Sequence, residues 1–519
     1  MTISKITSHN VNTTSKEYID ALIEASRKKK QPDTMIDEDI FEEDIPATQI
    51  KEKKETKKAV KKEAGFNAKQ EKVVSYIAPF IKEGKFGPYV HRGLLAEYLI
   101  TEIPAINSAG QLYIYENGVY RLAIPKEEQG IVKKLLTPEF STMPIINDVT
   151  QQWMIDERVN KSTGELNDNL YKLNLLNGYI NLKNEKGELV KSVNDLKLED
   201  HTPDYLSTIQ VQANFSKEAK GEHFLKFLDS SVPDKKMQML LQEMVGYSLT
   251  GLTDSKKMIF IFDGPGDSGK STFINATLEN LLSENAKSHV ELQELGDNEY
   301  KQAELFEKVV NIYADLPSKG IQDIGYLKAA SGNDWITARR IYGHPFQFKN
   351  KAKFVFSTNG MPANYSKDTS DAFYNRLTII PFKQVPKKKD LTLKDKLFNE
   401  KDFIFMWALE GLLRLVNNGF KFSESEVADQ LIQDYKQENN PVMRFVNEAC
   451  EFGEYTIARA SLYAEYENFC KLNGHNPLSA IKFNKELEKA YPELQKKQLS
   501  DARRTKAWVG IRVLDFMDI

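Results

Sequence analysis

The sequence predicts an α/β protein whose central part alternates strands and helices, and three observations carry that prediction. Met258–Phe262 is a short apolar run of the kind that forms a buried parallel strand. A glycine-rich loop follows it directly, and the apolar residues after the loop have helical spacing. Strand-like and helix-like patterns then continue to alternate through residues 257–385, as in a parallel sheet with crossover helices.

The loop after this first strand, Gly264–Ser271, fits the pattern G-x-x-x-x-G-K-[ST] at every fixed position. Glycines let such a loop curl until its backbone N–H groups point at a phosphate chain. Lys270 would add a charge at the β- and γ-phosphates, and the Ser271 hydroxyl would bind Mg²⁺. The alternative is an ordinary turn between strand and helix. We predict a site for ATP and Mg²⁺ built from Gly264, Pro265, Gly266, Asp267, Ser268, Gly269, Lys270, Ser271 and Thr272. The helix that follows should turn Phe273, Ile274, Thr277, Leu278 and Leu281 inward.

Length and composition set the outer limits. The 519 residues, 41% of them hydrophobic, are enough for about two to four domains. A formal net charge of −3 gives no global attraction to nucleic acid, so such contact would depend on local patches. Two cysteines predict a reducing compartment without a disulfide framework. Because no signal peptide or run of membrane-spanning length is present, we expect a cytoplasmic protein with no membrane partner.

Shifts in composition and pattern divide the chain into five expected segments. The first is a charged tail that is either an arm that docks a partner or touches DNA, or a plain solvated leader. An α+β module comes next, then a helical collar with the α/β core, then a helical connector. The last segment has three helical patterns and a terminal strand. The expected bounds are 1–66, 67–216, 217–390, 391–440 and 441–519.

The α+β module carries two hairpin signals, at Asn117-Gly118 and at Asn177-Gly178. Helical spacing over Lys69–Ile81 and Gly93–Ile100 predicts two helices. The stretch Gly84–Arg92 mixes aromatic and basic residues, a composition more typical of loop packing than of a nucleic-acid surface.

Two later strands of the core end in polar residues. Asp315 follows the β-run Val309–Ala314, and Asn359 follows Lys353–Thr358. Because the carboxyl ends of parallel strands meet at one edge of a sheet, Asp315 could hold Mg²⁺ through water. The Asn359 amide could orient the attacking water and sense the γ-phosphate. The alternative is that both residues simply end their strands.

Basic residues mark two further places. Arg376 stands directly before an apolar strand, where it suits a finger on a neighbouring subunit's γ-phosphate or a plain surface salt bridge. Residues 335–349 read as a hairpin with its tip near 342–345. If this hairpin points into a ring pore, it could bind a phosphodiester backbone. The alternative is an ordinary solvent-exposed basic hairpin that binds nothing. Its basic residues are Arg339, Arg340, His344 and Lys349.

The order of these parts resembles the superfamily 3 DNA helicases over roughly residues 70–519. The likeness is greatest to the phage/plasmid and poxvirus primase-helicase C-terminal type, which includes replication initiators of phage-satellite or pathogenicity islands. It is carried by the phosphate loop, the Ala-Asp strand end at Asp315, the basic hairpin, Phe-Ser-Thr-Asn at 356–359 and Asn-Arg-Leu at 375–377. The resemblance implies an AAA+-like P-loop ATPase core with a helical collar, and a winged helix at 441–519. One departure is that the superfamily usually pairs carboxylates where Asp315 stands alone between Ala314 and Leu316.

The resemblance also implies roles. It assigns Lys270 and Ser271 to nucleotide and Mg²⁺, Asp315 to the second acidic motif, Asn359 to the sensor and Arg376 to the finger. Arg339, Arg340 and His344 would be the pore hairpin. The implied protein is a homo-hexameric, ATP-dependent DNA helicase and replication initiator of a mobile genetic element. It would hydrolyse ATP at subunit interfaces, act on origin duplex and single strand, and work with a separate primase or host replication proteins.

The C-terminal segment has a local excess of positive charge. Residues 482–506 contain eight Lys/Arg and four Asp/Glu. Winged helices often present a helix to the major groove and a basic wing to phosphates, although they also serve as protein-docking modules. The candidate DNA contacts here are Lys496, Lys497, Arg503, Arg504 and Lys506. Two rival functions stay open at this point: a helicase-primase acting alone, and a DNA-binding ATPase switch that does not unwind.

Overall fold

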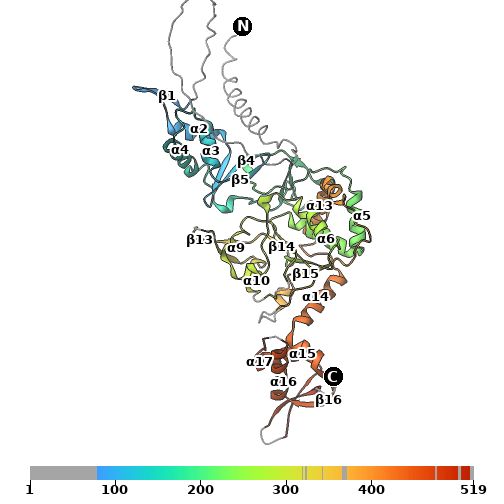
Figure 1. Ribbon diagram of the computed structural model, residues 1–519. Coiled ribbons are helices and arrows are strands. Elements are labelled where there is room, and N and C mark those ends of the chain that lie inside the picture. Colours follow the sequence, from blue (N-terminus) through green and yellow to red (C-terminus); the bar gives the residue numbers. More distant parts are fainter. Residues whose placement is uncertain are drawn as a thin grey trace, which may run out of the picture. The chain divides into compact units, whose positions relative to one another are not determined.

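The computed structural model describes residues 79–317, 320–321, 324–341, 343–364, 371–473, 476–500 and 504–514 (Figure 1). The predicted charged tail 1–66 and Arg503 lie outside these residues. The helix predicted over Lys69–Ile81 falls almost entirely outside them too, and its last residue, Ile81, begins a strand instead. No helix in the described ranges is both long enough and apolar enough to cross a membrane.

A parallel five-stranded sheet forms the α/β part of the chain. Its strands lie in the order β10-β11-β14-β9-β15, and all four neighbouring pairs are parallel. β14 is therefore inserted between two strands that precede it in the sequence. The residues that follow β9, β11 and β14 consequently meet at one edge of the sheet. The bounds are β9 Ile259–Asp263, β10 Lys287–Ser288, β11 Val310–Tyr313, β14 Lys353–Thr358 and β15 Leu377–Pro381.

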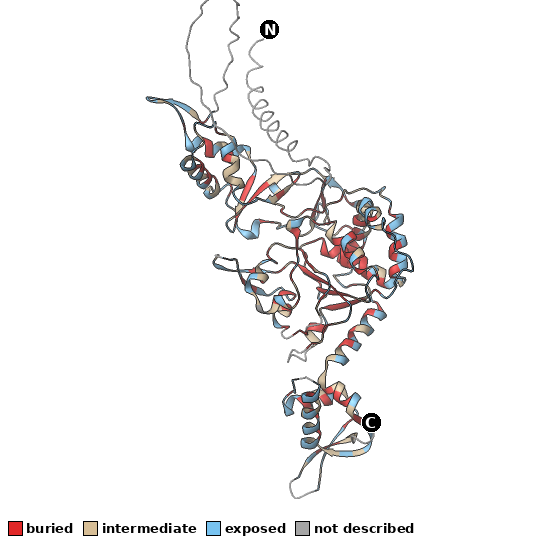
Figure 2. Ribbon diagram, viewed as in Figure 1, coloured by how far each residue is buried: buried red, intermediate tan, exposed pale blue. Residues whose placement is uncertain are grey.

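Both faces of this sheet are covered, which explains why its central strands β9 and β14 are almost entirely buried (Figure 2). Phe260 and Phe262 face one core, together with helices of the collar, whereas Ile259 and Ile261 face the other. The helix after the loop consists of α7 Lys270–Ile274 and a π-helical stretch, Asn275–Glu279. Its predicted inner face is confirmed, since all five residues named for it are buried.

The helical collar is held together by two helices whose backbones nearly touch. A Cβ on Gly246 of α6 would lie 2.2 Å from the carbonyl oxygen of Ala408, and one on Gly411 of α13 would lie 2.4 Å from Gln242. The Gln242 amide also donates to the Trp407 carbonyl at 2.7 Å. Glycine at both contact points thus permits this packing. The collar and connector helices are α5 Glu222–Ser231, α6 Lys235–Ser248, α12 Leu393–Asn399, α13 Lys401–Asn417 and α14 Glu426–Asn439.

The α+β module contains two three-stranded antiparallel sheets, β3-β4-β5 and β6-β7-β8. The hairpin at Asn117-Gly118 is confirmed, and both residues have the positive φ (52° and 84°) that a tight two-residue turn needs. The second turn lies one residue earlier than predicted, because Leu175 pairs directly with Gly178. The module's bounds are α2 Arg92–Glu102, β3 Ala105–Ser108, β4 Gln111–Glu116, β5 Val119–Leu122, α3 Glu127–Lys134, α4 Met143–Ile155, β6 Lys172–Leu175, β7 Gly178–Asn181 and β8 Leu198–Glu199.

The C-terminal segment has the three predicted helices and the terminal strand, with two further strands that pair with that strand. Its core centres on Trp508, Phe445, Tyr466 and Phe483, all of which are buried. The bounds are α15 Pro441–Ala449, β16 Cys450–Ala458, α16 Arg459–Leu472, α17 Ala480–Ala490, β17 Gln495–Gln498 and β18 Lys506–Val513.

The predicted basic hairpin is present and is attached closely to the sheet. β12 Trp335–Arg339 pairs with β13 Pro345–Lys349, and residues 350–352 alone separate β13 from β14. Asn350 in this joint is buried, and its side-chain NH₂ donates to the carbonyls of Ala330 (3.0 Å) and Ala352 (2.8 Å). Its side-chain oxygen accepts from the Ala352 N–H at 3.1 Å. The joint is therefore fixed by hydrogen bonds.

A fully buried lysine connects the start of β14 to the end of α6. The ammonium of Lys353 donates to the Thr250 carbonyl at 2.6 Å and lies 4.3 Å from the centroid of the Tyr247 ring. Burial lowers the pKa of Lys353 well below its ordinary value, and the Asp254 carboxylate acts in the opposite direction. The contact joins the central strand to the collar without a carboxylate partner within salt-bridge distance in the described part of the chain.

Candidate nucleotide site

The glycine-rich loop lies between β9 and α7, and Lys270 occupies its centre. Lys270 is 5% exposed, and its ammonium donates to the carbonyls of Gly264 (2.5 Å) and Pro265 (2.8 Å). The same ammonium donates to the side-chain oxygen of Asn359 at 3.1 Å. Burial lowers the pKa of Lys270, whereas the carboxylates of Asp263 and Asp315 act to raise it. The loop and the predicted sensor residue are thus in direct contact.

The loop's backbone leaves room for a phosphate chain. Gly264 has φ +154°, and a Cβ there would lie 2.0 Å from the carbonyl oxygen of Phe382, just after β15. By contrast, a Cβ on Gly266 would meet nothing within 4 Å. The Ser268 hydroxyl is buried and finds no hydrogen-bond partner among the residues described. A curled backbone, a central ammonium and an unused hydroxyl fit the oxygens of a nucleotide's phosphates.

Asp315 and Asn359 follow neighbouring strands at the same edge as the loop. Asp315 is exposed and has φ +55°, and its N–H donates to the Ser357 hydroxyl at 3.3 Å. Ser271 is exposed in the first turn of α7. The described residues contain no group of three or more His, Cys, Asp or Glu that could hold a metal by themselves. Ser271 and Asp315 instead suit Mg²⁺, which usually keeps phosphate and water among its ligands.

Two residues beside the loop were not predicted from the sequence. Asp263 ends β9, and one of its carboxylate oxygens is buried without a partner among the described residues. Burial raises the pKa of Asp263, while Lys270 and Lys383 act to lower it. Lys389, in the charged segment after β15, forms an ion pair with Asp267 at 2.7 Å. The parallel pairing of β15 with β9 explains the contact between Lys389 and Asp267, because it brings the chain after β15 to the loop.

Arg376 lies at the opposite edge of the sheet from the loop. Its carbonyl accepts from the N–H groups of Met258 and Ile259, where β9 begins. The five residues of β9, at about 3.3 Å each, put roughly 17 Å between the two edges. Its guanidinium donates to the Ala372 carbonyl at 2.6 Å, and its Nε is buried without a partner in the described ranges. Arg376 is therefore not part of its own subunit's loop site.

The four basic residues of the β12–β13 hairpin have different surroundings. Arg339, His344 and Lys349 are exposed. Arg340 is half-buried, with its guanidinium 5.3 Å from the ring centroid of Phe306 and 5.2 Å from that of Phe346. It also donates to the Ala109 carbonyl of the α+β module at 3.1 Å. Arg340 thus contributes to packing, whereas the other three present charge to solvent.

The basic residues of the C-terminal segment border one hollow. Lys496, Arg504 and Lys506 line a hollow of about 660 Å³ together with Lys485 of α17. Lys496 is also paired with Glu488 at 2.5 Å. Lys497 is exposed on β17. The structure therefore brings most of the predicted wing residues together.

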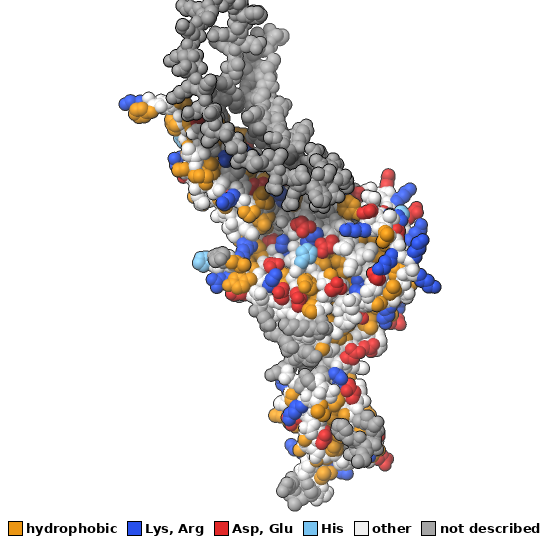
Figure 3. All heavy atoms as spheres, in the orientation of Figure 1, with side chains coloured by type: hydrophobic (Ala, Val, Ile, Leu, Met, Phe, Trp, Pro, Cys, Tyr) orange, Lys and Arg blue, Asp and Glu red, His pale blue; other side chains and the backbone are white. Residues whose placement is uncertain are grey.

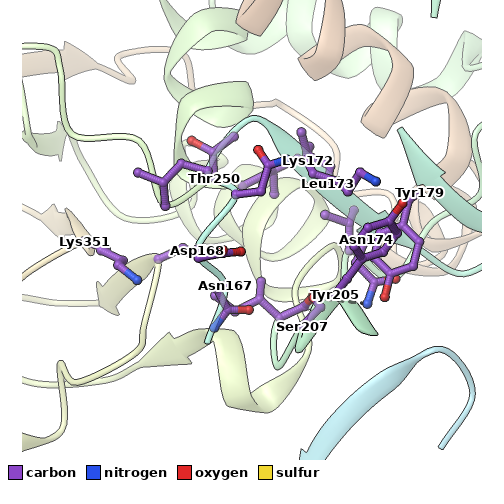
Figure 4. Close-up of a pocket in the computed structure, with 17 residues that line it drawn as sticks. Asn167, Asp168, Lys172, Leu173, Asn174, Tyr179, Tyr205, Ser207, Thr250 and Lys351 are labelled. Atoms are coloured by element: carbon purple, nitrogen blue, oxygen red, sulfur yellow. Dashed lines mark hydrogen bonds between the residues drawn. The ribbon is translucent and has the colours of Figure 1, made fainter. Parts of the chain in front are cut away.

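A second pocket, shown in Figure 4, does not belong to the nucleotide site. It has a volume of about 60 Å³, and its lining includes Lys172, Tyr179, Thr250 and Lys351. Lys351 precedes β14, so the pocket lies at the edge of the sheet where strands begin. Both its size and its place separate it from the phosphate loop.

Comparison with known proteins gives two family matches. Residues 262–376, which run from the end of β9 to Arg376, match a family of unknown function (DUF5906). Residues 437–518 match a family described as Poxvirus D5 protein-like. Together these matches cover the glycine-rich loop, strands β10, β11 and β14, the basic hairpin and most of the C-terminal segment, but not β15.

One curated relative and several solved structures are also similar. The putative helicase L207/L206 of Acanthamoeba polyphaga mimivirus is 28% identical over 169 residues, which are 30% of this chain and 16% of that protein. The chain therefore spans about a sixth of that relative. Two apo structures of the NrS-1 C-terminal region, each 11% identical, cover 80% of this chain and 98–99% of their own, with TM-scores of 0.46 and 0.43. The chain is thus similar in its C-terminal part to Poxvirus D5-like proteins and over 169 residues to a putative helicase.

Proposed function

We propose that this protein is an ATP-dependent, ring-forming DNA helicase and replication initiator of a mobile genetic element. The observation that carries the proposal is the contact between Lys270 and Asn359, which exists because β14 is inserted between β11 and β9. A phosphate loop, a strand-end acid and a strand-end amide then share one edge. The similarity to D5-type helicases supports DNA as the substrate.

Each residue of the site has a distinct task in this proposal. Lys270 exchanges the loop carbonyls for the β- and γ-phosphates of ATP, and Ser271 and Asp315 hold Mg²⁺, which offsets phosphate charge. Asn359 keeps contact with the γ-phosphate and positions the attacking water. The carboxylates of Asp263 and Asp315 both act on the Lys270 ammonium, and these two are the candidates for the group that polarises the attacking water.

Arg376 supports the ring. Its half-buried guanidinium has no carboxylate partner in the described residues and cannot reach the loop of its own chain. A head-to-tail interface would place it against the γ-phosphate of the neighbouring copy. The exposed residues of the β12–β13 hairpin, Arg339, His344 and Lys349, would then face a strand in the centre.

Lys270→Ala tests the assignment. We expect loss of ATP hydrolysis and of strand separation on a forked duplex, with a folded protein of unchanged unfolding temperature. Lys226→Ala, which removes an exposed lysine of α5, is the matched control and should behave as wild type. Full turnover by Lys270→Ala would refute the site.

Two further outcomes decide between the rivals. ATP hydrolysis without displacement of a forked duplex, at several salt concentrations, would identify a DNA-binding ATPase switch. RNA primer synthesis by the purified chain would identify a helicase-primase. The mass of the particle with an ATP analogue and forked DNA tests the hexamer.

A further inference from the structure

A hairpin at the start of the described chain projects from the α+β module. β1 Ile81–Gly84 pairs with β2 Gly87–Val90, in register from Ile81–Val90 to Gly84–Gly87, so residues 85 and 86 form a two-residue turn. Figure 1 shows this hairpin extending beyond α2 and α4, and Figure 2 shows it mostly exposed. Its base is fixed, because Val90 packs in the module's core.

The outer half of this hairpin carries two uncovered aromatic rings. Phe86 in the turn is 97% exposed, and Tyr89 is 47% exposed. In the pairing register, Tyr89 shares a face with Lys82 and with the two glycines, Gly84 and Gly87. The Tyr89 ring lies over Gly84, where a Cβ would come within 3.0 Å of it. With no side chains on the glycines, this face is an open platform for a flat ring.

The basic residue Lys82 and the acidic residue Glu83 lie on opposite faces of the hairpin. Lys82 stands opposite Tyr89 in the register, and the ammonium of Lys85 lies 5.8 Å from the Phe86 ring centroid. The single acid, Glu83, points to the other face because side chains alternate along a strand. Figure 3 shows basic and hydrophobic side chains together at this projecting end. The aromatic face is therefore basic.

We propose that hairpin β1–β2 binds single-stranded nucleic acid. Bases stack on Phe86 and Tyr89, and Lys82 and Lys85 contact the phosphates on either side. Exposed rings with flanking cations are the combination that holds a single strand without sequence preference. The composition of Gly84–Arg92 favoured loop packing, and the exposure of Phe86 corrects that interpretation. This contact is separate from the ATP site, the β12–β13 hairpin and the C-terminal segment.

Affinity for a labelled oligothymidylate, measured by fluorescence anisotropy with the full chain, tests the proposal. Stacking contributes enough per base that Phe86→Ala with Tyr89→Ala should weaken binding at least about 10-fold. Ile124→Ala with Leu391→Ala removes two other exposed hydrophobic residues and should leave affinity unchanged. Lys82→Ala with Lys85→Ala should lower the slope of log affinity against log salt by about 1.4.

A spectroscopic measurement separates stacking from general charge effects. Phe86→Trp adds an exposed indole, and its emission should be quenched when the oligonucleotide binds, beyond any quenching in wild type. Unchanged affinity of the double aromatic variant, or no added quenching in a complex that anisotropy shows to form, would overturn the proposal. ATP hydrolysis without DNA should be normal in all these variants. A failure here is thus distinguishable from a failure of the ATP site.

Discussion

Arg376 provides the most direct test of the proposed ring, because a residue at its position could act only on a nucleotide bound by a neighbouring subunit. It lies beside the start of β9, roughly 17 Å from the loop at the other end of that strand. An arginine side chain spans less than half of this distance. If the guanidinium acts on a γ-phosphate, that phosphate must be bound by another copy of the chain.

Two inactive variants should therefore rescue each other when mixed. Arg376→Ala should lose about 10³-fold or more in hydrolysis, the range for removal of an arginine finger. Lys270→Ala should be inactive because its own loop lacks the ammonium that would contact the β- and γ-phosphates. In a ring mixed one to one, about a quarter of the interfaces would pair an intact loop with an intact finger, and activity should return toward that fraction.

The assay is steady-state ATP hydrolysis by each variant and by the mixture, with co-assembly followed by the mass of the particle. Arg376→Ala should keep the unfolding temperature of wild type to within a few degrees, since it loses one hydrogen bond to Ala372. A mixture that co-assembles and stays as inactive as its parents would refute the reasoning. Arg376 would then have a role inside its own subunit and not at the site of a neighbour.

Three other predictions follow from packing. Gly264→Ala should abolish binding of a fluorescent ATP analogue because its Cβ would lie 2.0 Å from a carbonyl oxygen. Gly130→Ala, in α3 of the α+β module where a Cβ meets nothing within 4 Å, should bind normally, and equal affinities would contradict this. Arg340→Ala should lower the unfolding temperature by about 1 to 2 °C, since cation–π contacts of about 0.5–2 kcal/mol are lost in a large unit. The exposed Arg339→Ala should leave the unfolding temperature unchanged and slow unwinding instead. Because burial depresses the pKa of Lys353, the unfolded state binds more protons than the folded state as the pH approaches the ordinary lysine pKa of about 10.4, and the free energy of unfolding should rise with pH in that range. The urea midpoints of Lys353→Met should show a shallower rise with pH.

Features set by neighbouring residues were predictable from the sequence. The Asn117-Gly118 turn needs positive φ at both positions, and this dipeptide supplies it. The buried face of the helix after the loop followed from its spacing. The turn at Leu175–Gly178 was displaced by one residue because Gly178 is required by a distant contact: a Cβ there would lie 2.3 Å from the Glu199 carbonyl. Local pattern could not reveal that contact.

The site shows the same division. The loop, Asp315 and Asn359 could each be found in the sequence as local motifs. Which of them touch depends on the order of the strands in the sheet, and that order could not be predicted from one sequence. The insertion of β14 produced the Lys270–Asn359 contact. Likewise, Arg339 and Arg340 are adjacent in sequence and equally basic. Only tertiary packing distinguishes the exposed residue from the one between two phenylalanines.

The short joint at Asn350 has a mechanical consequence. β14 ends next to the residue that contacts Lys270, and three residues separate its start from the basic hairpin. The Asn350 amide fixes this joint by its hydrogen bonds. No long linker lies between the basic hairpin and β14 that could absorb a displacement. A displacement at the loop end of β14 would therefore be passed along the strand to the basic hairpin at its other end.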